Sequence, residues 1–353
     1  MASIITRALA ILRQGYPLVE ATVIRRQGSA PRAAGAKMII DPSGNQEGTV
    51  GGGILEARVI EKAQATFQNQ RPQIIAFDLT GTDVADSALI CGGRTEVLID
   101  FIRPDPATIA LFEGRLRALE EEKPGYYLTL AQGSEDRIDH TDHHLLFLNE
   151  QASAHIRSLP SDILAQIQQQ AGGSETIGIA SGDGCFVVAE KLEIPKNAFF
   201  FGAGHVVKFT AAFAAQVGFR TVIIDDRKAF ANPQRYPLAH KTIVIKDFKN
   251  AFANLDVGRN DFLIIATRGH VHDRTVLAQA LKHKAAYIGM IGSVRKRETI
   301  YKSLLAEGYT QQDFNRVFCP IGLAIDAETP EEIGISIVAQ MIQIRAGHDQ
   351  QNR

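Results

Sequence analysis

The second half of the chain alternates short apolar runs with amphipathic helical patterns, and this alternation restricts it to few folds. The apolar runs after residue 197 are AFFF, TVIID, TIVI, FLIIAT, AYIGMIG and RVFC, and the helical patterns cover 205–217, 275–283, 294–307 and 330–345. Apolar strands separated by helices are typical of a parallel sheet covered by helices on both faces. We therefore predict a doubly wound α/β domain over residues 197–353.

The first half of the chain has a different pattern and predicts a second domain. Short strands such as LVEATVIRR, AKMIID and TEVLIDFI are mixed with helical patterns at 54–68, 106–122 and 161–170. This mixture indicates an N-terminal mixed α+β domain over residues 1–190, because 353 residues are enough for two domains of ordinary size. The charged, proline-containing stretch EKLEIPKN at 190–197 is the expected linker.

Composition excludes several classes of protein. A net charge of -1 and 7% aromatic residues, with no tryptophan, give no footprint for nucleic acid. No apolar run reaches the ~18 residues of a membrane span, and the N-terminus has the pattern of an amphipathic helix rather than of a signal peptide. Three scattered cysteines, Cys91, Cys185 and Cys319, fit a cytoplasmic protein rather than a disulfide framework.

The stretch FFFGAGHVVKFTAAFAAQVGFRTVIIDD resembles a dinucleotide-binding unit of the Rossmann type. Gly202 would form the tight turn, Gly204 would let the backbone approach a pyrophosphate, and the helix that begins near His205 would face that anion. Asp225 follows at about the distance expected for the acid that binds a ribose hydroxyl. Val207 replaces the third glycine of the fingerprint, so the alternative is a Rossmann-like domain whose nucleotide site has been reused.

Two later loops carry further polar groups. ATRGHVHDR places His270, His272 and Asp273 after a predicted strand, which is a weak pattern for a metal site because only three ligands lie together. Helix capping by the aspartate and solvent-facing imidazoles are the alternatives. GMIGSVRKRE places Gly292 and Ser293, followed by cations, at a helix start, which suits an anionic ligand.

A glycine cluster, GTVGGGILEARVI at 48–60, precedes a predicted helix. Gly51, Gly52 and Gly53 would form a backbone nest for an anion. The segment is not a P-loop, because it does not end in Gly-Lys-Ser/Thr. The stretch GSAPRAAG adds Ser29 and Arg32 as a second candidate anion contact. The alternative is a tight strand-to-helix connection that binds nothing.

Cys91 is the candidate reactive residue of the first half. In ALICGGRTEVLID, Gly92 and Gly93 would leave its thiol uncovered, and Arg94 could favour the thiolate. A buried structural cysteine is the alternative, since free cysteines are among the most buried residues. The stretch DHTDHHLLF at 139–147 is interpreted as a solvated polar turn between strands.

Together these motifs resemble the XdhC/CoxI family of molybdenum hydroxylase accessory proteins. The resemblance covers nearly the whole chain and rests on GSAPRAAGAKMII, GTVGGGILEA and CGGRTEVLID in the first half and on FGAGHV, TRGHVHD, IGMIGSVRKR and CPIGLAIDAETPEEIGISIVAQ in the second. Motifs in this number and order are more specific than any one of them. The chain shows no iron–sulfur cysteine pattern, so an accessory protein fits better than the hydroxylase itself.

The resemblance implies a chaperone for molybdenum cofactor (molybdopterin). Such a protein binds the cofactor, protects it during sulfuration and inserts it into a xanthine dehydrogenase-type molybdenum hydroxylase. A cysteine desulfurase-type sulfur donor is a further implied partner, and a homodimer is an allowed assembly. The glycine nest would hold the anionic cofactor, and Cys91 would contact molybdenum or carry sulfur.

Two other classes of protein stay open. An NAD(P)-dependent oxidoreductase would use Gly202, Gly204 and Asp225 for its cofactor and His270 or His272 for proton transfer. A small metal-dependent enzyme would use the same histidines together with the aspartate that follows them.

Overall fold

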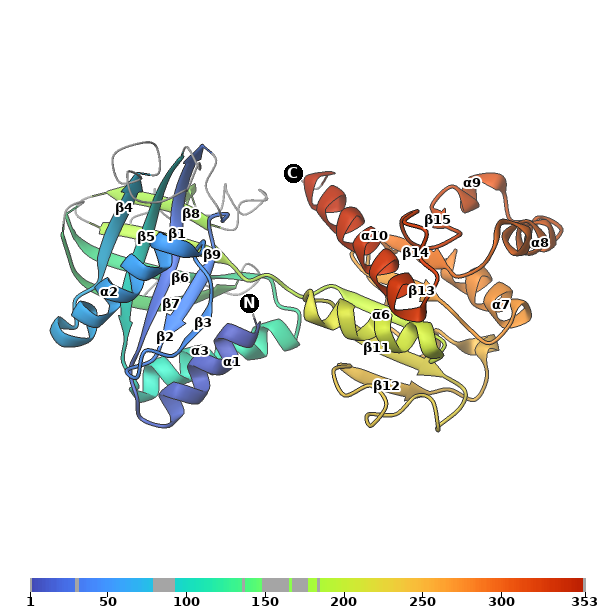
Figure 1. Cartoon of the computed structure of the whole chain (residues 1–353), viewed down its shortest axis with the longest axis horizontal. Helices are drawn as coiled ribbons and strands as arrows, with labels where there is room; N and C mark the ends of the chain where they lie inside the picture. Colours follow the sequence, from blue (N-terminus) through green and yellow to red (C-terminus); the bar gives the residue numbers. More distant parts are fainter. Residues whose placement is uncertain are drawn as a thin grey trace. The chain divides into compact units, whose positions relative to one another are not determined.

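A computed structural model describes residues 2–28, 32–78, 93–134, 137–147, 165–166, 177–182 and 185–351 of the chain. The chain folds into two units, Met1–Ile194 and Pro195–Arg353 (Figure 1). The division falls within the stretch 190–197 that the sequence indicates as the linker. No described helix is long and apolar enough to cross a membrane.

The N-terminal unit contains two antiparallel sheets, with strand orders β3-β2-β1-β5-β4 and β7-β6-β9-β8. The strands of the first sheet are β1 (Leu18–Gly28), β2 (Lys37–Ile40), β3 (Gln46–Gly48), β4 (Gln73–Asp78) and β5 (Gly93–Ile102). Those of the second are β6 (Gly125–Ser134), β7 (Arg137–Phe147), β8 (Ile177–Gly182) and β9 (Cys185–Lys191). The helices of this unit are α1 (Ala2–Arg13), α2 (Gly53–Asn69) and α3 (Pro106–Glu120).

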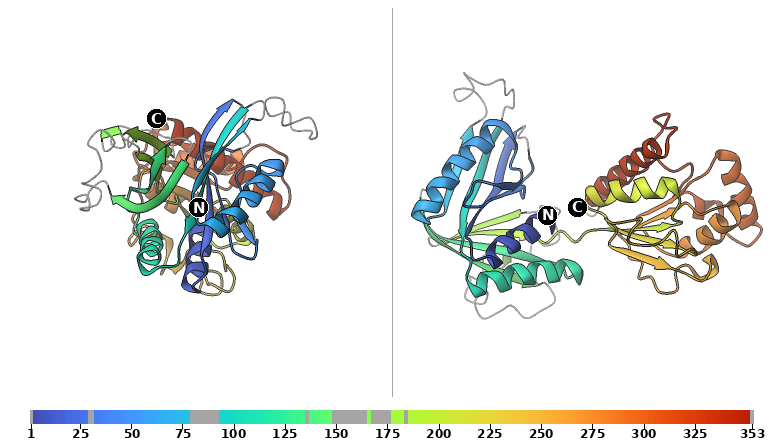
Figure 2. Two further views of the ribbon diagram at one scale, coloured as in Figure 1. Left: turned by 90° about the vertical axis from the view of Figure 1, so that its left-hand side faces the viewer. Right: turned by 60° about the horizontal axis from the view of Figure 1, so that its bottom comes forward.

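Alternation along β1 shows how both faces of the first sheet become buried. Val19, Ala21 and Val23 pack in one apolar cluster with α2, which lies against this face of the sheet (Figure 2). The residues between them, Glu20 and Thr22, point to the opposite face and are also buried. Because side chains alternate along a strand, one run of sequence supplies an apolar layer and a buried polar layer.

The C-terminal unit is built on one parallel sheet with the strand order β12-β11-β10-β13-β14-β15. Its strands are β10 (Asn197–Phe201), β11 (Arg220–Asp225), β12 (Lys241–Val244), β13 (Phe262–Ile265), β14 (Tyr287–Met290) and β15 (Val317–Phe318). This is the order of a dinucleotide-binding Rossmann sheet, with β10 as its first strand. The carboxyl ends of β10 and β13 therefore flank the point where the strand order reverses.

Helices cover both faces of this sheet, as the apolar runs predicted. The helices are α6 (His205–Gln216), α7 (His270–Ala280), α8 (Val294–Leu305), α9 (Gln311–Phe314) and α10 (Pro330–Gln351), with a 3-10 turn η1 (Phe248–Asn250). One core cluster joins α6 and α10 to the sheet through residues such as Val207 and Met341. The other joins α7 and α8 through residues such as Leu277 and Leu304. The predicted fold class is confirmed for both halves of the chain.

Three sequence interpretations differ from the structure. The stretch 139–147, interpreted as a polar turn, lies in β7, because its alternate side chains are directed into the unit and satisfied there. The sheet that contains β7 has no counterpart in the sequence prediction. The helix predicted at 275–283 begins earlier, at His270.

The helix predicted at 161–170 lies largely outside the described residues.

Candidate functional site

The glycine cluster folds into a backbone nest at the start of α2. Gly51, Gly52 and Gly53 have φ values of 148°, 77° and 58°. At φ 77° and ψ 174°, Gly52 occupies a backbone region that is almost exclusive to glycine. Glu56 Oε1 accepts a hydrogen bond from the Gly52 N–H, 3.0 Å away, and another from the Thr49 hydroxyl. The nest thus holds an anion, which is a carboxylate of the same helix.

The electrostatics of Glu56 show how strongly the nest favours negative charge. Burial opposes ionisation of Glu56, but the Thr49 hydroxyl and backbone N–H groups of residues 50–52 outweigh it and lower the pKa of the carboxyl. Glu56 is therefore ionised at neutral pH. An external phosphate in this nest would have to displace the Glu56 carboxylate from these donors.

The other candidates of the first half are only partly described. Arg32 is exposed, and Gly93 is buried at the start of β5, where it pairs with Gly28 of β1. Ser29, Cys91 and Gly92 lie outside the described residues. The roles assigned to these five positions from the sequence remain predictions.

The glycine turn after β10 serves packing at one position and leaves space at the other. A Cβ at Gly202, where φ is 111°, would collide with the carbonyl oxygen of Ala266, so close contact with the chain after β13 requires glycine. A Cβ at Gly204 would have nothing within 4 Å, and this glycine begins α6 without a side-chain cap from any described residue. The exposed His205 follows it. The start of α6 therefore keeps backbone N–H groups available to an anion.

Asp225 at the end of β11 is fully engaged by its own chain. Its Oδ1 accepts hydrogen bonds from the backbone N–H and Nε of Arg227, at 3.0 and 2.8 Å. Its Oδ2 accepts from the Ala203 N–H at 2.8 Å and from Arg227 Nη2 at 2.9 Å. Burial opposes ionisation of Asp225, but Arg227 outweighs it and lowers its pKa. Four donors fill the acceptor positions that a ribose diol would need.

Val207, which stands in place of a third glycine, is part of the core. Its side chain is 1% exposed and packs with the apolar cluster of α6, α10 and the sheet. In a dinucleotide-binding unit that glycine allows the helix to lie close to the strand. Here a valine occupies that position, so α6 contacts the sheet through a buried branched side chain and not through the close backbone approach that a glycine allows.

The weak metal candidates do not form a metal site. Among the described residues, no group of three His, Cys, Asp or Glu side chains could hold a metal ion. Asp273 is fully buried, where its Oδ1 accepts from Thr267 and its Oδ2 pairs with Lys296 Nζ. The His272 ring packs against Phe248 instead, with a centroid distance of 5.2 Å. Successive positions in the first turn of α7 point these side chains in different directions.

Gly292 and Ser293 form the start of α8. Ser293 caps the helix, since its hydroxyl accepts from the Lys296 N–H at 3.3 Å. A Cβ at Gly292 would lie 2.7 Å from Cδ of Lys296, whose Nζ donates to the Ile291 carbonyl at 3.0 Å. The Lys296 ammonium is thus engaged by groups of the protein, and its ion pair with Asp273 connects the starts of α7 and α8.

Sequence reasoning missed a cluster of buried charged side chains in the N-terminal unit. Lys37 Nζ lies 2.7 Å from Glu20 Oε1, 2.7 Å from Thr22 Oγ1 and 2.9 Å from Glu190 Oε1. The Lys37 side chain is 2% exposed. These contacts connect β1 and β2 of the first sheet to β9 of the second.

An aromatic ring extends the cluster to α3 and β7. The guanidinium carbon of Arg115 lies 3.8 Å from the Tyr127 ring centroid, and Arg115 Nη1 lies 3.7 Å from Glu20 Oε2. The His143 ring stacks on Tyr127 with a 5.6 Å centroid distance and a 7° interplanar angle. His143 Nε2 is 2.7 Å from Asp100 Oδ2. The cluster therefore fastens α3 and the two sheets to one another.

Burial and pairing set the ionisation of the cluster. Burial raises the pKa of Glu20, but Lys37 and Arg115 outweigh it and bring that pKa to about 2. Burial also raises the pKa of Glu190, and here the cations do not reverse it. For His143, burial favours the neutral ring, but Asp100 outweighs it and raises the pKa. The pKa values of these buried groups are thus set by burial and by their charged neighbours and not by contact with solvent.

The fold and its sites define a two-domain protein in which a Rossmann sheet follows an antiparallel α+β unit, with glycine-rich helix starts suited to anions. Two family models match the chain: XdhC and CoxI family over residues 11–78, and XdhC Rossmann domain over residues 199–341. The chain belongs to the XdhC and CoxI family.

Named relatives extend over nearly the whole chain. A Bacillus subtilis protein, described as a probable subunit of xanthine dehydrogenase, is 26% identical over 95% of this chain and 96% of its own length. The molybdenum cofactor insertion chaperone PaoD of Escherichia coli is 22% identical over 97% of this chain and 88% of its own length. A crystal structure from Bacillus halodurans, described as a xanthine dehydrogenase, has a TM-score of 0.75 at 26% identity and covers 97% of this chain and 96% of its own.

Proposed function

We propose that this protein binds molybdenum cofactor in the cytoplasm, supports its sulfuration and inserts it into a xanthine dehydrogenase-type molybdenum hydroxylase. It acts as an accessory protein, and its partners are that apoenzyme and a cysteine desulfurase-type sulfur donor. A second copy of the chain is a further candidate partner.

The observation that carries the proposal is the similarity to a molybdenum cofactor insertion chaperone over 97% of this chain. A Rossmann domain alone would carry little, because this fold serves many unrelated functions. The similarity includes the antiparallel N-terminal unit as well, so the two proteins have both units in common. Named relatives of similar length refer to xanthine dehydrogenase, which supports the choice of client enzyme.

The described residues fit the anionic part of such a cofactor. When bound to its client, the molybdenum cofactor supplies the redox centre of the hydroxylase. The open start of α6 at Gly204 offers backbone N–H groups and a partial positive charge to the cofactor phosphate. The nest at Gly52 offers the same chemistry once Glu56 moves away from it. Cys91 is the proposed contact for molybdenum or sulfur, because a thiolate is a soft ligand.

The strand order of the C-terminal sheet favours a second candidate, an NAD(P)-dependent oxidoreductase. The engagement of Asp225 by Ala203 and Arg227 opposes it, since ribose hydroxyls would have to replace charge-assisted hydrogen bonds. Calorimetric titration of the full chain with NAD and NADP separates the two candidates. Heat of binding that disappears in Asp225→Asn would favour the oxidoreductase, and its absence in the wild type would remove that candidate.

Reconstitution of the client enzyme tests the proposed function. Purified apo-hydroxylase is mixed with cofactor and a sulfur donor, with and without this protein, and hydroxylase activity is measured. We expect activation that depends on the protein and is lost in Cys91→Ser but not in Cys319→Ser. Cys319 is a matched control because it is 6% exposed, and burial raises its pKa to about 11. Equal activation without the protein would refute the proposal, and full activity of Cys91→Ser would remove only the role of that cysteine.

A further inference from the structure

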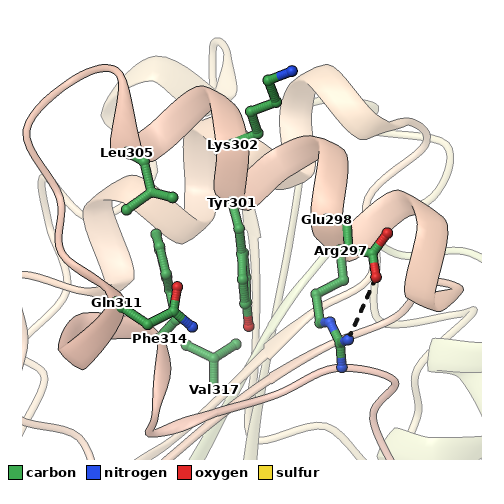
Figure 3. A pocket seen from close by; sticks show the side chains of 8 residues that line it. All are labelled: Arg297, Glu298, Tyr301, Lys302, Leu305, Gln311, Phe314 and Val317. Atoms are coloured by element: carbon green, nitrogen blue, oxygen red, sulfur yellow. Dashed lines mark ion pairs between the residues drawn. The ribbon is translucent and has the colours of Figure 1, made fainter.

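A depression of about 480 Å³ opens on the C-terminal unit between α8, α9 and β15, and Arg297 of its lining lies one turn after Ser293 on α8 (Figure 3). Small-molecule sites in proteins typically have volumes of about 300 to 1,000 Å³ and combine apolar walls with a few polar groups. The lining here has that combination, since aromatic side chains meet cations and one amide.

One wall of the pocket is a pair of stacked aromatic rings. The rings of Tyr301 and Phe314 have centroids 4.1 Å apart and an interplanar angle of 11°. Phe314 is 3% exposed, so it fixes Tyr301 from behind. Figure 3 shows Tyr301 between Phe314 and Arg297, so the face of the tyrosine that Phe314 does not cover is turned toward the guanidinium. A flat ring bound there would contact an aromatic face and a cation, both of which favour stacking.

The polar groups of the pocket favour a negative charge. Arg297 Nη1 donates to the Cys319 carbonyl at 3.0 Å, which fixes the guanidinium in place. The one carboxylate of the lining, Glu298, is 4.0 Å from Arg297 Nη2 and is 69% exposed, so the pair is weak. Lys302 adds a second cation at the rim, where its ammonium is turned outward in Figure 3. The lining therefore carries one more positive than negative charge.

The Tyr301 phenol and the Gln311 amide add hydrogen-bonding groups to the lining. Burial, with a smaller contribution from Cys319, raises the pKa of Tyr301 to about 12. The phenol therefore keeps its proton at neutral pH and can donate a hydrogen bond. Gln311, at the start of α9, offers both a donor and an acceptor through its amide. The lining therefore offers hydrogen-bond donors and an acceptor to the polar atoms of a ligand, such as those of a heterocycle.

We infer that this pocket binds a flat heteroaromatic ring that carries a phosphate group. With a nucleotide as ligand the inference goes beyond the proposed function, and with a pterin phosphate it rests on that function, because molybdopterin is itself a pterin phosphate. Pterin phosphates and purine nucleotides share this chemistry, so both are used as probes. Binding of the pterin probe would connect the pocket to cofactor handling, and binding of the nucleotide would make it an effector site. Either result supports the inference.

The test is calorimetric titration of the full chain with a pterin phosphate, guanosine monophosphate, unphosphorylated pterin and inorganic phosphate. We expect one ring-phosphate probe to bind at least about tenfold more tightly than its ring or its phosphate alone. Tyr301→Leu keeps an apolar contact with Phe314 but loses the flat surface, and should weaken binding about tenfold or more. Lys302→Glu should weaken the phosphate-bearing probe most at low salt.

A matched variant controls for general effects of charge. Lys241→Glu reverses an exposed cation on β12, at the opposite edge of the same sheet from β15. It should leave binding unchanged. The inference is overturned if neither ring-phosphate probe binds, or if binding is the same in wild type, Tyr301→Leu and Lys302→Glu. Melting temperatures of the variants, measured alongside, identify any loss of binding that comes from unfolding.

Discussion

The Glu56 carboxylate accepts a hydrogen bond from the Gly52 amide, with 3.0 Å between Oε1 and nitrogen, so the α2 nest is filled by the helix that it begins. The glycine cluster that predicted an anion site thus forms such a site. The anion bound there is the Glu56 carboxylate of the same chain. Any role of this nest in holding a cofactor phosphate requires competition between that phosphate and Glu56.

The first prediction follows from this competition. Glu56→Gln keeps the size of the side chain and removes its charge, so we expect tighter binding of the cofactor if its phosphate enters the nest. The same change should lower the free energy of unfolding by about 0.5–2 kcal/mol, because the amides lose a charged acceptor. Cofactor titration and urea denaturation measure the two effects. Unchanged cofactor affinity would exclude this nest as the site of the phosphate.

The second prediction concerns the backbone at Gly52. Nothing lies within 4 Å of a Cβ at this position, yet φ is 77°, so Gly52→Ala should destabilise by roughly 1–3 kcal/mol through backbone strain alone. Gly347→Ala is the control, since that glycine is helical and also has open space around it. The control should be neutral or stabilising by up to about 1 kcal/mol. Equal effects of the two variants in urea denaturation would contradict the strain.

The third prediction concerns the buried charges. Lys37→Met leaves the carboxylates of Glu20 and Glu190 without their shared cation, so the unfolding free energy of the N-terminal unit should fall by about 3–5 kcal/mol. Lys62→Met removes a 45% exposed lysine of the same unit and should change it by less than about 1 kcal/mol. Chemical denaturation compares them. If Lys37→Met lowered the unfolding free energy by less than about 1 kcal/mol, the cluster would not stabilise the N-terminal unit as proposed.

The fourth prediction gives the pH dependence of the same unit. The lowered pKa of Glu20, about 2, gives stability that is present above pH 4.5 and lost as the pH falls toward 2. His143 has a raised pKa, so its contribution is complete below pH 6.5 and is lost as the pH rises through the folded-state value. Glu190 also has a raised pKa, so its contribution is complete below pH 4.5 and is lost as the pH rises through its own folded-state value. Stability should therefore decline at both ends of the range.

Melting temperature measured as a function of pH checks this profile. His143→Gln should reduce the decline on the alkaline side, because the group that loses its proton there is absent. His140→Gln is the control, since this histidine lies on the same strand with a side chain that is 53% exposed. An alkaline decline of the same size in wild type and His143→Gln would contradict the assignment.

The parallel sheet could be predicted from the sequence because its strands are apolar on both faces. Runs such as FLII, which forms β13, have no other suitable environment, and the helices between them have lengths that allow crossover connections. The start of α7 is predicted too late because the histidines at its first turn resemble a polar loop. In the structure, Asp273 Oδ1 accepts hydrogen bonds from Thr267, just before the helix, and Oδ2 pairs with Lys296 of α8.

The second antiparallel sheet and the charged cluster could not be predicted in the same way. The available signal was a single charged residue within or next to the apolar segment of each of β1, β2 and β5, namely Glu20, Lys37 and Asp100. Their partners Glu190 and His143 are far along the chain, and pairing over such distances depends on strand register. A single sequence does not contain the register of strands that lie in different sheets.

The nucleotide fingerprint shows a similar limit. Gly202 and Asp225 have the spacing of a dinucleotide site. This spacing does not reveal that the carboxylate of Asp225 is already hydrogen-bonded to Arg227, two residues further on. A cation so close in sequence to the expected ribose acceptor could have indicated an internal ion pair. The glycine itself is explained by contact with Ala266, which no local pattern reports.

The cofactor content of the protein itself tests the proposed function most directly. The full chain is purified from cells that synthesise molybdenum cofactor, and its molybdenum and oxidised pterin are quantified against protein. We expect both in near-stoichiometric and matching amounts, with loss of both when purified apo-hydroxylase is added and becomes active. Protein that carries neither molybdenum nor pterin, and that neither takes up added cofactor nor activates the apoenzyme, would refute the proposed binding and insertion of molybdenum cofactor.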